Sequence, residues 1–493
     1  MTLRELLSGA GLKGTLAPDL AGREIAGLDY DSRRVNAGFV FFAFPGSKVD
    51  GRKFAEGAVA RGAVAVVSES PAPEGFLSPW LQVEHGRRAL ALAARRFYGA
   101  PDERLKLTGI TGTNGKTTTG FLIDAVMRAA GHTTGLIGTI EYHLAGRVLP
   151  AVNTTPESLD LLRLFAELVQ EGGTAATMEV SSHALALGRV YGLHFHTAVF
   201  TNLTRDHLDF HGTMEEYFAA KELLFTGAGA PAPPCAVLNR DDEYARRLKV
   251  HPKTEVFWYG LGADANLKAK HISSGVQGLK FEVQYGKQRF EVTSPLIGKI
   301  NVFNILAACG AGLSYGLDGE TIGRGIASLH AVPGRFERVD EGQPFTVVVD
   351  YAHTDDALRN VIAVARGLNP KRVITLFGCG GDRDRAKRPL MGKAAAEASD
   401  LVVLTSDNPR SEEPLAIMND ALVGIRRVDV QHIVEPDRAI AIGRALKEAR
   451  EGDIVILAGK GHETYQVLKD RTIAFDDRAV AREVLRGYGY RKS

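Results

Sequence analysis

Short apolar runs, separated by polar loops and helix-forming stretches, recur along the whole chain. In the first hundred residues, an opening helical pattern is followed by apolar runs at 39–46 and 63–70 and by the helix-forming segment 87–97. Strand and helix patterns that succeed one another in this way predict a small α/β domain. The polar, proline-containing segment 99–106 ends the pattern, so we expect this domain to cover residues 1–104.

A strand, a glycine-rich loop and a helix open the second part of the chain from residue 107. Further apolar runs, separated by helix-type stretches, lie at 133–140, 175–180, 196–202 and 235–239. Strands that alternate with helices predict a mostly parallel sheet with helices on both faces. We expect this central domain to cover residues 105–331.

The pattern restarts beyond the segment 331–339, where apolar runs again alternate with helices. These runs predict a C-terminal, doubly wound, Rossmann-like α/β domain over residues 332–493. Ligands of such sheets bind at the carboxyl ends of the strands. The polar residues that directly follow each strand are therefore the candidates for chemistry.

Composition narrows the class of protein. The 493 residues include 60 Lys and Arg against 58 Asp and Glu, a formal net charge of +2, which gives no support for a nucleic-acid partner. The three cysteines have no metal-ligand spacing, and no apolar run reaches the ~18 residues of a membrane span. The first residues lack the apolar core of a secretory signal. We expect a cytoplasmic protein without membrane insertion.

The strongest motif is the glycine-rich loop that follows the first strand of the central domain. It consists of Gly112, Thr113, Asn114, Gly115, Lys116, Thr117 and Thr118. Backbone N–H groups of such a loop turn toward phosphate oxygens, Lys116 would reach the β- and γ-phosphates, and Thr117 would bind Mg²⁺. Ile110 departs from the strict pattern, and a plain threonine-capped turn is the alternative. The strand before and the helix after favour phosphate binding.

Three further segments of the central domain are ambiguous when they are read alone. Glu179 ends a strand, where a carboxylate is either solvated, a helix cap or a Mg²⁺ ligand. The segment 201–212 offers Asp206, His207, Asp209 and His211, which suggests a transition-metal cluster or a hydrolase site but lacks a second His pair or a nucleophile elbow. Lys221 lies on a predicted amphipathic helix, where a solvated lysine is the ordinary interpretation.

Three polar loops follow strands of the C-terminal domain, at 377–389, 406–414 and 457–463. The first is not a dinucleotide-binding fingerprint, because Arg383 stands where the third glycine belongs. In the second, the Asn408-Pro409 turn projects Arg410, although the loop could simply initiate a helix. Three such loops at one edge of a sheet predict one ligand site.

The motifs taken together resemble the Mur ligase family, ATP-dependent enzymes that build the peptide stem of peptidoglycan. The resemblance rests on TGTNGKTT, MEVSSH, TNLTRDHLDFHG, EEYFAAK, the pair Asn301 and Asn304, PGRFE and VDYAH, which occur in the family's order. The segment DSRRVNAGFVFFAFPG and the pair DNPR and GKGHE narrow it to members that add meso-2,6-diaminopimelate to UDP-MurNAc-L-Ala-D-Glu.

The resemblance implies a three-domain monomeric ligase whose domains bind, in chain order, the uridine diphosphate end of the substrate, ATP with Mg²⁺, and the incoming amino acid. The motif match implies that UDP-MurNAc-dipeptide is bound by Ser32, Ser47, Lys48, Val49, Asn153, Thr154, Thr155, Ser181 and Arg189. It implies that ATP is bound by residues 112–118, Asn301, Asn304, Arg335 and Asp350. It implies that diaminopimelate is bound by Arg383, Asp407, Asn408, Pro409, Arg410, Gly459 and Glu463.

The resemblance also implies how the reaction runs. A carboxylate of the substrate attacks the γ-phosphate of ATP, and Lys116 and Mg²⁺ shield the two anions from each other. Thr117 and Glu179 would hold one Mg²⁺ ion, and His207 and Lys221 a second. Because an ammonium cannot bind a cation, Lys221 is expected to carry a CO₂-derived carbamate. The acyl phosphate that forms is then attacked by the amine of the amino acid, after domain closure that excludes water.

Two other functions remain open from the sequence. A folate polyglutamate synthetase shares the ATP core but leaves the DSR-type N-terminal domain unexplained. A nucleotide-switch protein, whose phosphate loop would gate binding to a partner, leaves the three C-terminal loops without a role. ADP release that requires both acceptors together would distinguish a ligase from a switch.

Overall fold

The computed structural model describes residues 1–46 and 49–491. By compactness the chain divides into two units. One unit comprises Met1–Lys268, Gln284–Arg289 and Asn304–Gly325, and the other comprises Ala269–Val283, Phe290–Phe303 and the chain from Ile326 onward. The first unit holds the N-terminal sheet and most of the central sheet, and the second holds the C-terminal sheet.

The N-terminal part is the small α/β domain that the sequence predicts. Its sheet has the order β1-β2-β3-β4, with every neighbouring pair parallel. The strands are β1 (Gly27–Asp29), β2 (Phe39–Phe42), β3 (Ala65–Ser68) and β4 (Trp80–Gln82), and the helices are α1 (Leu3–Leu6), α2 (Pro18–Ala21), α3 (Ala55–Ala60) and α4 (Gly86–Phe97). The alanine-rich face of α4 is buried, because small side chains at helical spacing let it pack closely.

The central sheet has the order β15-β14-β13-β12-β11-β10-β5-β9-β6-β7-β8. Its strands are β5 (Lys106–Thr111), β6 (Thr134–Ile137), β7 (Glu141–Leu144), β8 (Arg147–Pro150), β9 (Ala175–Glu179), β10 (Thr197–Phe200), β11 (Cys235–Asn239), β12 (Glu255–Gly260), β13 (Leu267–Gly275), β14 (Gly278–Tyr285) and β15 (Gln288–Ser294). β5 lies between β9 and β10 and is parallel to both. The phosphate-loop motif therefore follows a central, fully paired strand. The antiparallel hairpin β7–β8 at one edge was not predicted.

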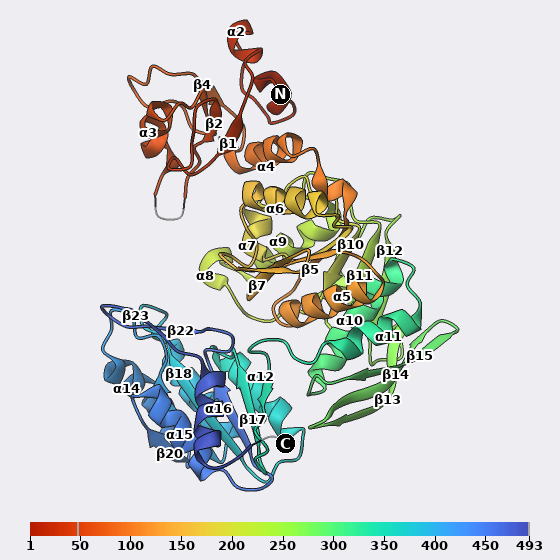
Figure 1. The fold of residues 1–493 in the computed structure, drawn as a ribbon, viewed down its shortest axis with the longest axis vertical. Coiled ribbons are helices and arrows are strands. Elements are labelled where there is room, and N and C mark those ends of the chain that lie inside the picture. Colours follow the sequence, from red (N-terminus) through yellow and green to blue (C-terminus); the bar gives the residue numbers. More distant parts are fainter. Residues whose placement is uncertain (47–48, 492–493) are drawn as a thin grey trace. The chain divides into compact units, whose positions relative to one another are not determined.

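Helices cover both faces of the central sheet. They are α5 (Lys116–Ala129), α6 (Ser158–Gln170), α7 (Ser182–Ala186), α8 (Leu208–His211), α9 (Met214–Thr226), α10 (Ile300–Ser314) and α11 (Gly319–Ser328). α5 lies against one face of the sheet, and α6 and α9 lie against the other (Figure 1). Apolar residues of α6 and α9 share a core with those of α4. The predicted mostly parallel sheet with helices on both faces is confirmed.

The C-terminal sheet has the order β16-β17-β21-β18-β19-β20, parallel except for the edge strand β16. The strands are β16 (Glu337–Val339), β17 (Thr346–Asp350), β18 (Val373–Cys379), β19 (Leu401–Ser406), β20 (Gln431–Val434) and β21 (Ile454–Ala458), with a separate hairpin of β22 (Tyr465–Val467) and β23 (Thr472–Ala474). The helices are α12 (Asp355–Arg366), α13 (Lys387–Ala398), α14 (Pro414–Ile425), α15 (Arg438–Glu448) and α16 (Asp477–Gly487).

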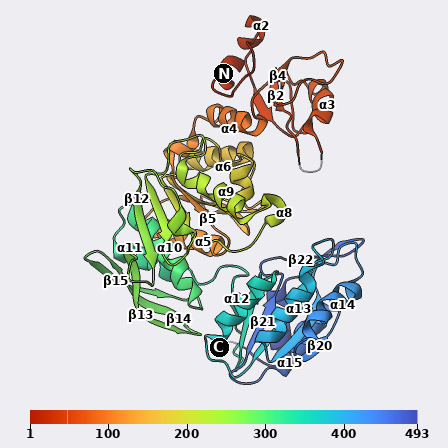
Figure 2. The same ribbon diagram turned by 180° about the vertical axis from the view of Figure 1, so that it is seen from behind.

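Two separate apolar cores flank this sheet, one formed with α12, α13 and α14 and the other with α15 and α16. Figure 2 shows α12, α13, α14 and α15 from behind, and α16 is labelled in Figure 1. The predicted doubly wound architecture is confirmed. The loops at 377–389, 406–414 and 457–463 follow β18, β19 and β21, which are neighbours in the sheet, so the predicted convergence of these loops is also confirmed.

In the part of the chain that the structure describes, every helix is too short or too polar to cross a membrane. The cysteines Cys235, Cys309 and Cys379 are buried as free thiols.

Candidate active site

The glycine-rich loop joins the end of β5 to the first residue of α5, and two of its glycines have no room for a side chain. Gly112 has φ +143°, and a Cβ there would lie 1.9 Å from Oγ1 of Thr201. Gly115 has φ +86°, and a Cβ there would lie 2.5 Å from Oδ1 of Asn304. Left-handed conformation and close approach both require glycine. The loop therefore lies in close contact with α10 and with the residues that follow β10.

The segment after β10 braces the loop through its backbone. The carbonyl of Asn114 accepts hydrogen bonds from Oγ1 of Thr201 at 2.7 Å and from Nδ2 of Asn202 at 3.1 Å. The N–H of Asn114 donates to Oδ1 of Asn202 at 3.0 Å. Sequence reasoning took the 201–212 segment as a source of metal ligands and missed this bracing role of its first two residues.

Two lysines from different helices converge on the loop. Nζ of Lys116 donates to the carbonyls of Gly112 at 3.0 Å and Thr113 at 2.8 Å, and Nζ of Lys221 donates to the same Gly112 carbonyl at 2.9 Å. Lys221 is 1% exposed and lies over the ring of Tyr217. Burial, with a smaller effect of the Lys116 charge, holds the pKa of Lys221 well below its usual range. The interpretation of Lys221 as a solvated lysine is wrong.

Glu179 is also buried, with 2% of its surface exposed at the end of β9. Its Oε1 accepts from the N–H of Thr139 at 2.9 Å and its Oε2 from Oγ1 of Thr139 at 3.1 Å. The interpretation as a solvated strand end is therefore wrong. Thr139, which sequence reasoning missed, fixes a carboxylate whose oxygens are of the kind that Mg²⁺ prefers.

His207 has a left-handed backbone with φ +53°, and its N–H donates to Oδ1 of Asp206 at 2.8 Å. Its ring lies perpendicular to that of His183, with 4.9 Å between the centroids. Burial lowers the pKa of His207, which favours the neutral imidazole that can bind a metal. His211 instead pairs its Nε2 with Oγ of Ser182 at 2.9 Å.

The transition-metal alternative for the 201–212 segment gains no support. Among residues 1–46 and 49–491, no three His, Cys, Asp or Glu side chains are grouped as ligands of one metal ion. The residues that could hold Mg²⁺ are instead Thr117 and Glu179, which supply oxygen donors. His207 and Lys221 could hold a second ion if the amine of Lys221 is modified so that it carries oxygen donor atoms.

Four of the residues assigned to the dipeptide gather at the carboxyl end of β9. Oγ1 of Thr155 donates to the carbonyl of Glu179 at 2.8 Å and accepts from the N–H of Ser181 at 3.0 Å. Nη1 of Arg189 donates to the Thr155 carbonyl at 3.1 Å. Oγ1 of Thr154 lies 3.1 Å from Oγ1 of Thr139, which holds Glu179. The dipeptide residues and the carboxylate thus form one continuous network.

Of the other residues assigned to the nucleotide-sugar, Asn153, Ser32 and Val49 lie within the described part of the chain. The carbonyl of Asn153 accepts from the hydroxyl of Tyr142. Ser32 is half-buried, and Val49 is 46% exposed. Ser47 and Lys48 lie outside the described residues.

In the second unit, the loops after β19 and β21 share a buried lysine. Lys460 is 0% exposed, and its Nζ lies 3.2 Å from both Oδ1 of Asn408 and Oε2 of Glu463 and 3.9 Å from Oδ1 of Asp407. Nδ2 of Asn408 donates to the same Oε2 of Glu463 at 2.9 Å. Gly459, with φ +112°, leaves room for Asp407, because a Cβ there would lie 2.7 Å from its Oδ2. Lys460 was not predicted.

The loops after β18 and β19 meet at Arg410, whose backbone is left-handed with φ +52°. Its Nη1 donates to the carbonyl of Gly381 at 2.8 Å, and a Cβ at Gly380 would lie 3.1 Å from that Nη1. Pro409 precedes it, and Arg383 is exposed beside Gly380. Arg410 is therefore fixed by the neighbouring loop as well as by its own turn.

Three residues assigned to ATP also lie in the second unit. Nδ2 of Asn301 donates to the carbonyl of Ile297 at 2.8 Å, and the Arg335 guanidinium lies over the ring of Tyr351. Asp350 accepts backbone hydrogen bonds at both oxygens, from Phe336 at 2.7 Å and Ala352 at 2.9 Å. The carboxylate of Asp350 thus fixes the PGRFE turn against the end of β17.

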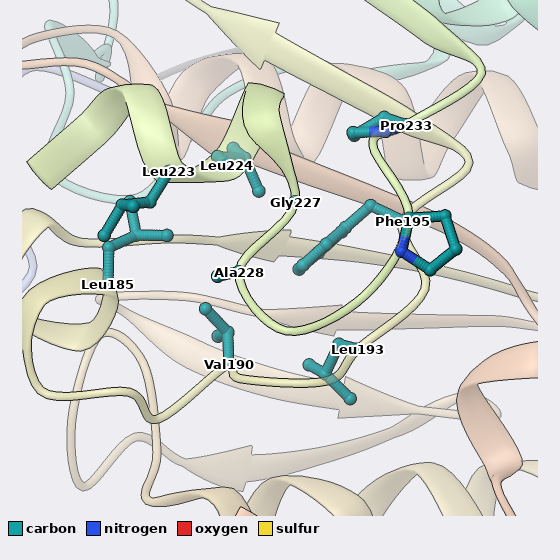
Figure 3. A pocket seen from close by; sticks show the side chains of 10 residues that line it. Leu185, Val190, Leu193, Phe195, Leu223, Leu224, Gly227, Ala228 and Pro233 are labelled. Carbon is teal, nitrogen blue, oxygen red and sulfur yellow. The ribbon is translucent and has the colours of Figure 1, made fainter. Parts of the chain in front are cut away.

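An apolar pocket lies beside α7 and α9 in the first unit (Figure 3). It is lined by Leu185, Val190, Leu193, Phe195, Leu223, Leu224, Gly227, Ala228, Pro231 and Pro233. No lining residue has a polar side chain, so the pocket cannot fix the orientation of a nucleotide or an amino acid. The candidate chemistry lies at the loops described above.

Comparison with known proteins agrees with this geometry. Family models match three stretches: "Mur ligase family, catalytic domain" at residues 24–98, "Mur ligase middle domain" at 110–312, and "Mur ligase, glutamate ligase domain" at 334–461. A protein of Solibacter usitatus named UDP-N-acetylmuramoyl-L-alanyl-D-glutamate–2,6-diaminopimelate ligase is 75% identical over 493 residues, with 100% of both chains covered. One with the same name from Geobacillus thermodenitrificans is 48% identical over 94% of this chain and 95% of that protein.

Solved structures also include a protein with the name of these relatives. A structure titled as that ligase is 33% identical, with a TM-score of 0.73 over 99% of each chain. The folylpolyglutamate synthase of Mycobacterium tuberculosis, 19% identical with a TM-score of 0.61, covers 76% of this chain and 92% of that chain and shows a shared fold alone. The full-length match at 75% identity decides the family. The chain belongs to the Mur ligase family.

Proposed function

We propose that the chain is an ATP-dependent ligase that joins meso-2,6-diaminopimelate to the D-Glu γ-carboxylate of UDP-MurNAc-L-Ala-D-Glu, a step in peptidoglycan precursor synthesis. The observation that carries this proposal is the convergence of Lys116 and Lys221 on one carbonyl of the phosphate loop. The full-length likeness to proteins named for this reaction supports it. ATP and a UDP-linked substrate are cytoplasmic compounds, so we expect a cytoplasmic enzyme, acting as a monomer.

Lys116 would shield the negative charges of the two reacting groups from each other. The substrate carboxylate and the γ-phosphate repel each other, which raises the barrier to phosphoryl transfer. A fixed cation lowers this barrier because it stabilises the negative charge that develops in the transition state. The loop carbonyls of Gly112 and Thr113 hold the ammonium near the phosphate-binding N–H groups. The ATP would be positioned further by Asn301, Asn304, Arg335 and Asp350. The carboxylate oxygen forms a bond to the γ-phosphorus, ADP leaves, and the product is an acyl phosphate.

Two Mg²⁺ ions fit the donors that are available. Thr117 and the Glu179 carboxylate, aligned by Thr139, would hold one, and His207 and Lys221 the other. Bound Mg²⁺ would neutralise charge on the phosphate oxygens. Because Thr139 hydrogen-bonds both oxygens of Glu179, the carboxylate is fixed in one orientation toward a cation.

Lys221 would enter this site as a carbamate. Its neutral amine, favoured by burial, attacks the carbon of CO₂, an N–C bond forms, and a proton leaves to solvent. The neutral amine would thereby become an anion with two oxygen donors, and that anion would attract the Lys116 ammonium. The carbamate therefore explains how the side chains of Lys116 and Lys221 can both lie at the Gly112 carbonyl without repelling each other.

The diaminopimelate would bind at the three C-terminal loops. Arg410 would pair with the distal carboxylate, with Arg383 nearby, since a guanidinium can grip a carboxylate through two parallel hydrogen bonds. Asp407, Asn408, Pro409, Gly459 and Glu463 would form the rest of the pocket. Lys460 lies 3.2 Å from Glu463 and 3.9 Å from Asp407, so the distal ammonium would share these two carboxylates with that lysine.

The proposal is tested by ADP release with each acceptor alone and with both together. A ligase requires UDP-MurNAc-L-Ala-D-Glu and diaminopimelate for steady turnover. ADP release that needs neither acceptor would instead identify a nucleotide switch or a plain ATPase. Turnover with a folate and glutamate would identify the other ligase class.

A further inference from the structure

A buried carboxylate between two arginines lies where α4 of the N-terminal domain packs against α6 of the central domain. Glu157 immediately precedes α6, and the side chain is 10% exposed. Its Oε2 lies 3.5 Å from Nε of Arg87 and 3.4 Å from Nε of Arg189. Arg87 belongs to α4 of the N-terminal sheet's domain, and Arg189 follows α7. One carboxylate thus pairs with cations from segments about a hundred residues apart.

The side chain of Glu157 has no capping role. It occupies the N-cap position of α6, but forms no hydrogen bond to the first turn of the helix. Within residues 1–46 and 49–491, its Oε1 and both arginine Nε atoms are buried and without a hydrogen-bond partner. Burying a carboxylate in this way costs stability unless charge compensates it. Burial raises the pKa of Glu157, while Arg189 and Arg87 lower it in opposition.

Each arginine is tied to a different substrate-binding segment. Arg87 stacks over the ring of Phe44 at 4.4 Å, and its Nη1 donates to the carbonyl of Pro45 at 3.2 Å. Pro45 leads into the segment that contains Ser47, Lys48 and Val49, assigned to the nucleotide-sugar. Nη1 of Arg189 donates to the carbonyl of Thr155, assigned to the dipeptide.

Asp160, in the first turn of α6, makes a second connection of the same kind. Oδ1 of Asp160 lies 3.2 Å from Nη1 of Arg34, and its Oδ2 accepts from the hydroxyl of Tyr30. Tyr30 and Arg34 flank Ser32, the other nucleotide-binding candidate. The start of α6 is therefore connected, through its two carboxylates and the arginines that pair with them, to the segment around Ser32, to Pro45 and to the dipeptide residue Thr155.

We propose that Glu157 is a positioning residue that holds Arg87 and Arg189 so that the backbone of the N-terminal domain at Phe44 and Pro45 and the dipeptide site at Thr155 are set for parts of one substrate together. This inference rests on the proposed function. It adds Arg87 and Glu157, neither of which belongs to the motif set, to the residues that determine affinity for the UDP-linked dipeptide. Neutralising Glu157 should have two opposed effects on the affinity for the UDP-linked dipeptide. The added net positive charge would favour binding of the anionic substrate, whereas the loss of the fixed positions of the two guanidinium groups would weaken binding. We infer that geometry dominates, because both arginines also hold backbone carbonyls of the binding segments.

The test is calorimetric binding of UDP-MurNAc-L-Ala-D-Glu, without ATP, to wild type and to Glu157→Gln. We expect the Kd of the variant to rise about fivefold or more, with the KM for ATP unchanged. Glu167→Gln, which removes an exposed carboxylate paired with Arg147 on the same helix, is the matched control and should change Kd less than about twofold. An unchanged or lower Kd in Glu157→Gln would overturn the proposal.

A double-mutant cycle keeps the test valid if Glu157→Gln does not fold. Arg87→Ala and Arg189→Ala, singly and together in the native chain, should have non-additive effects on the same Kd, because both act through Glu157. Additive effects within about twofold would refute the coupling. A wild-type chain that fails to bind the UDP-linked dipeptide would contradict the proposed function itself, which separates the two failures.

Discussion

The Nζ atom of Lys221 donates a hydrogen bond of 2.9 Å to the carbonyl of Gly112. It joins α9 to the first residue of the phosphate loop, 109 positions earlier in the chain. Burial makes the charged ammonium unfavourable there, and Lys116 bonds the same carbonyl. The relationship explains why a lysine that looks like an ordinary surface residue in the sequence belongs to the site.

Replacement of Lys221 by alanine should abolish turnover, because the carbamate oxygens are lost. Short carboxylates such as acetate or formate, which can occupy the vacated space, should restore part of the activity. ADP release with and without added carboxylate measures both effects. Lys221→Arg, which keeps a cation but cannot react with CO₂, should be inactive as well. Full activity in this arginine variant would rule out the carbamate.

Lys116→Ala should reduce kcat by about two to three orders of magnitude or more, because a fixed charge on the transferring phosphate is removed. Single-turnover ADP formation measures the chemical step. The exposed Lys447→Ala is a suitable control and should retain wild-type rates. Near-normal rates in Lys116→Ala would show that the loop has only a structural role.

Arg410→Ala should erase the preference for meso-diaminopimelate over L-lysine. The two amino acids differ by the distal carboxylate, and an unpaired guanidinium in a closed pocket can reject the wrong one by about four orders of magnitude. The ratio of kcat/KM for the two amino acids measures the preference. The exposed Arg427→Ala should leave the ratio unchanged. If the wild type uses both equally, or the alanine variant keeps its preference, the DNPR turn does not recognise the carboxylate.

His211 should make the chain less stable as the pH falls. Burial lowers its pKa to about 4 in the folded chain, below the ordinary value of about 6.5, so the unfolded chain binds the proton first. Stability is therefore lost between about pH 6.5 and pH 4, by about 2 kcal/mol at most at pH 5. His211→Gln should show a smaller fall in Tm between pH 7 and pH 5 than wild type. An equal fall in both would contradict this account, and exposed His330→Gln serves as the control.

The local elements could be predicted because their signals are local. The apolar run before Gly112 and the helix after it are adjacent in sequence. The three C-terminal loops could be placed at one edge of their sheet because ligand loops follow the carboxyl ends of parallel strands. Glu179 could be placed at a strand end for the same reason. Its burial could not be predicted, because it depends on Thr139 from another strand's loop.

The missed residues have partners that are distant in sequence. Lys460 is buried against Asn408, 52 positions away, and reads in the sequence only as part of a glycine-rich loop. Glu157 pairs with arginines on two other segments, and nothing near it in the sequence signals either. Burial of a charge is a tertiary property, so hydrophobic periodicity and motif spacing do not show it.

The central claim is that the D-Glu γ-carboxylate is activated by the γ-phosphate of ATP and then joined to diaminopimelate. The most direct measurement uses UDP-MurNAc-L-Ala-D-Glu with ¹⁸O in that carboxylate and follows the label by mass spectrometry. The account predicts that one ¹⁸O atom appears in the inorganic phosphate and that the nucleotide product gains diaminopimelate with loss of water. Inorganic phosphate without ¹⁸O, or ADP release without the tripeptide product, would contradict it.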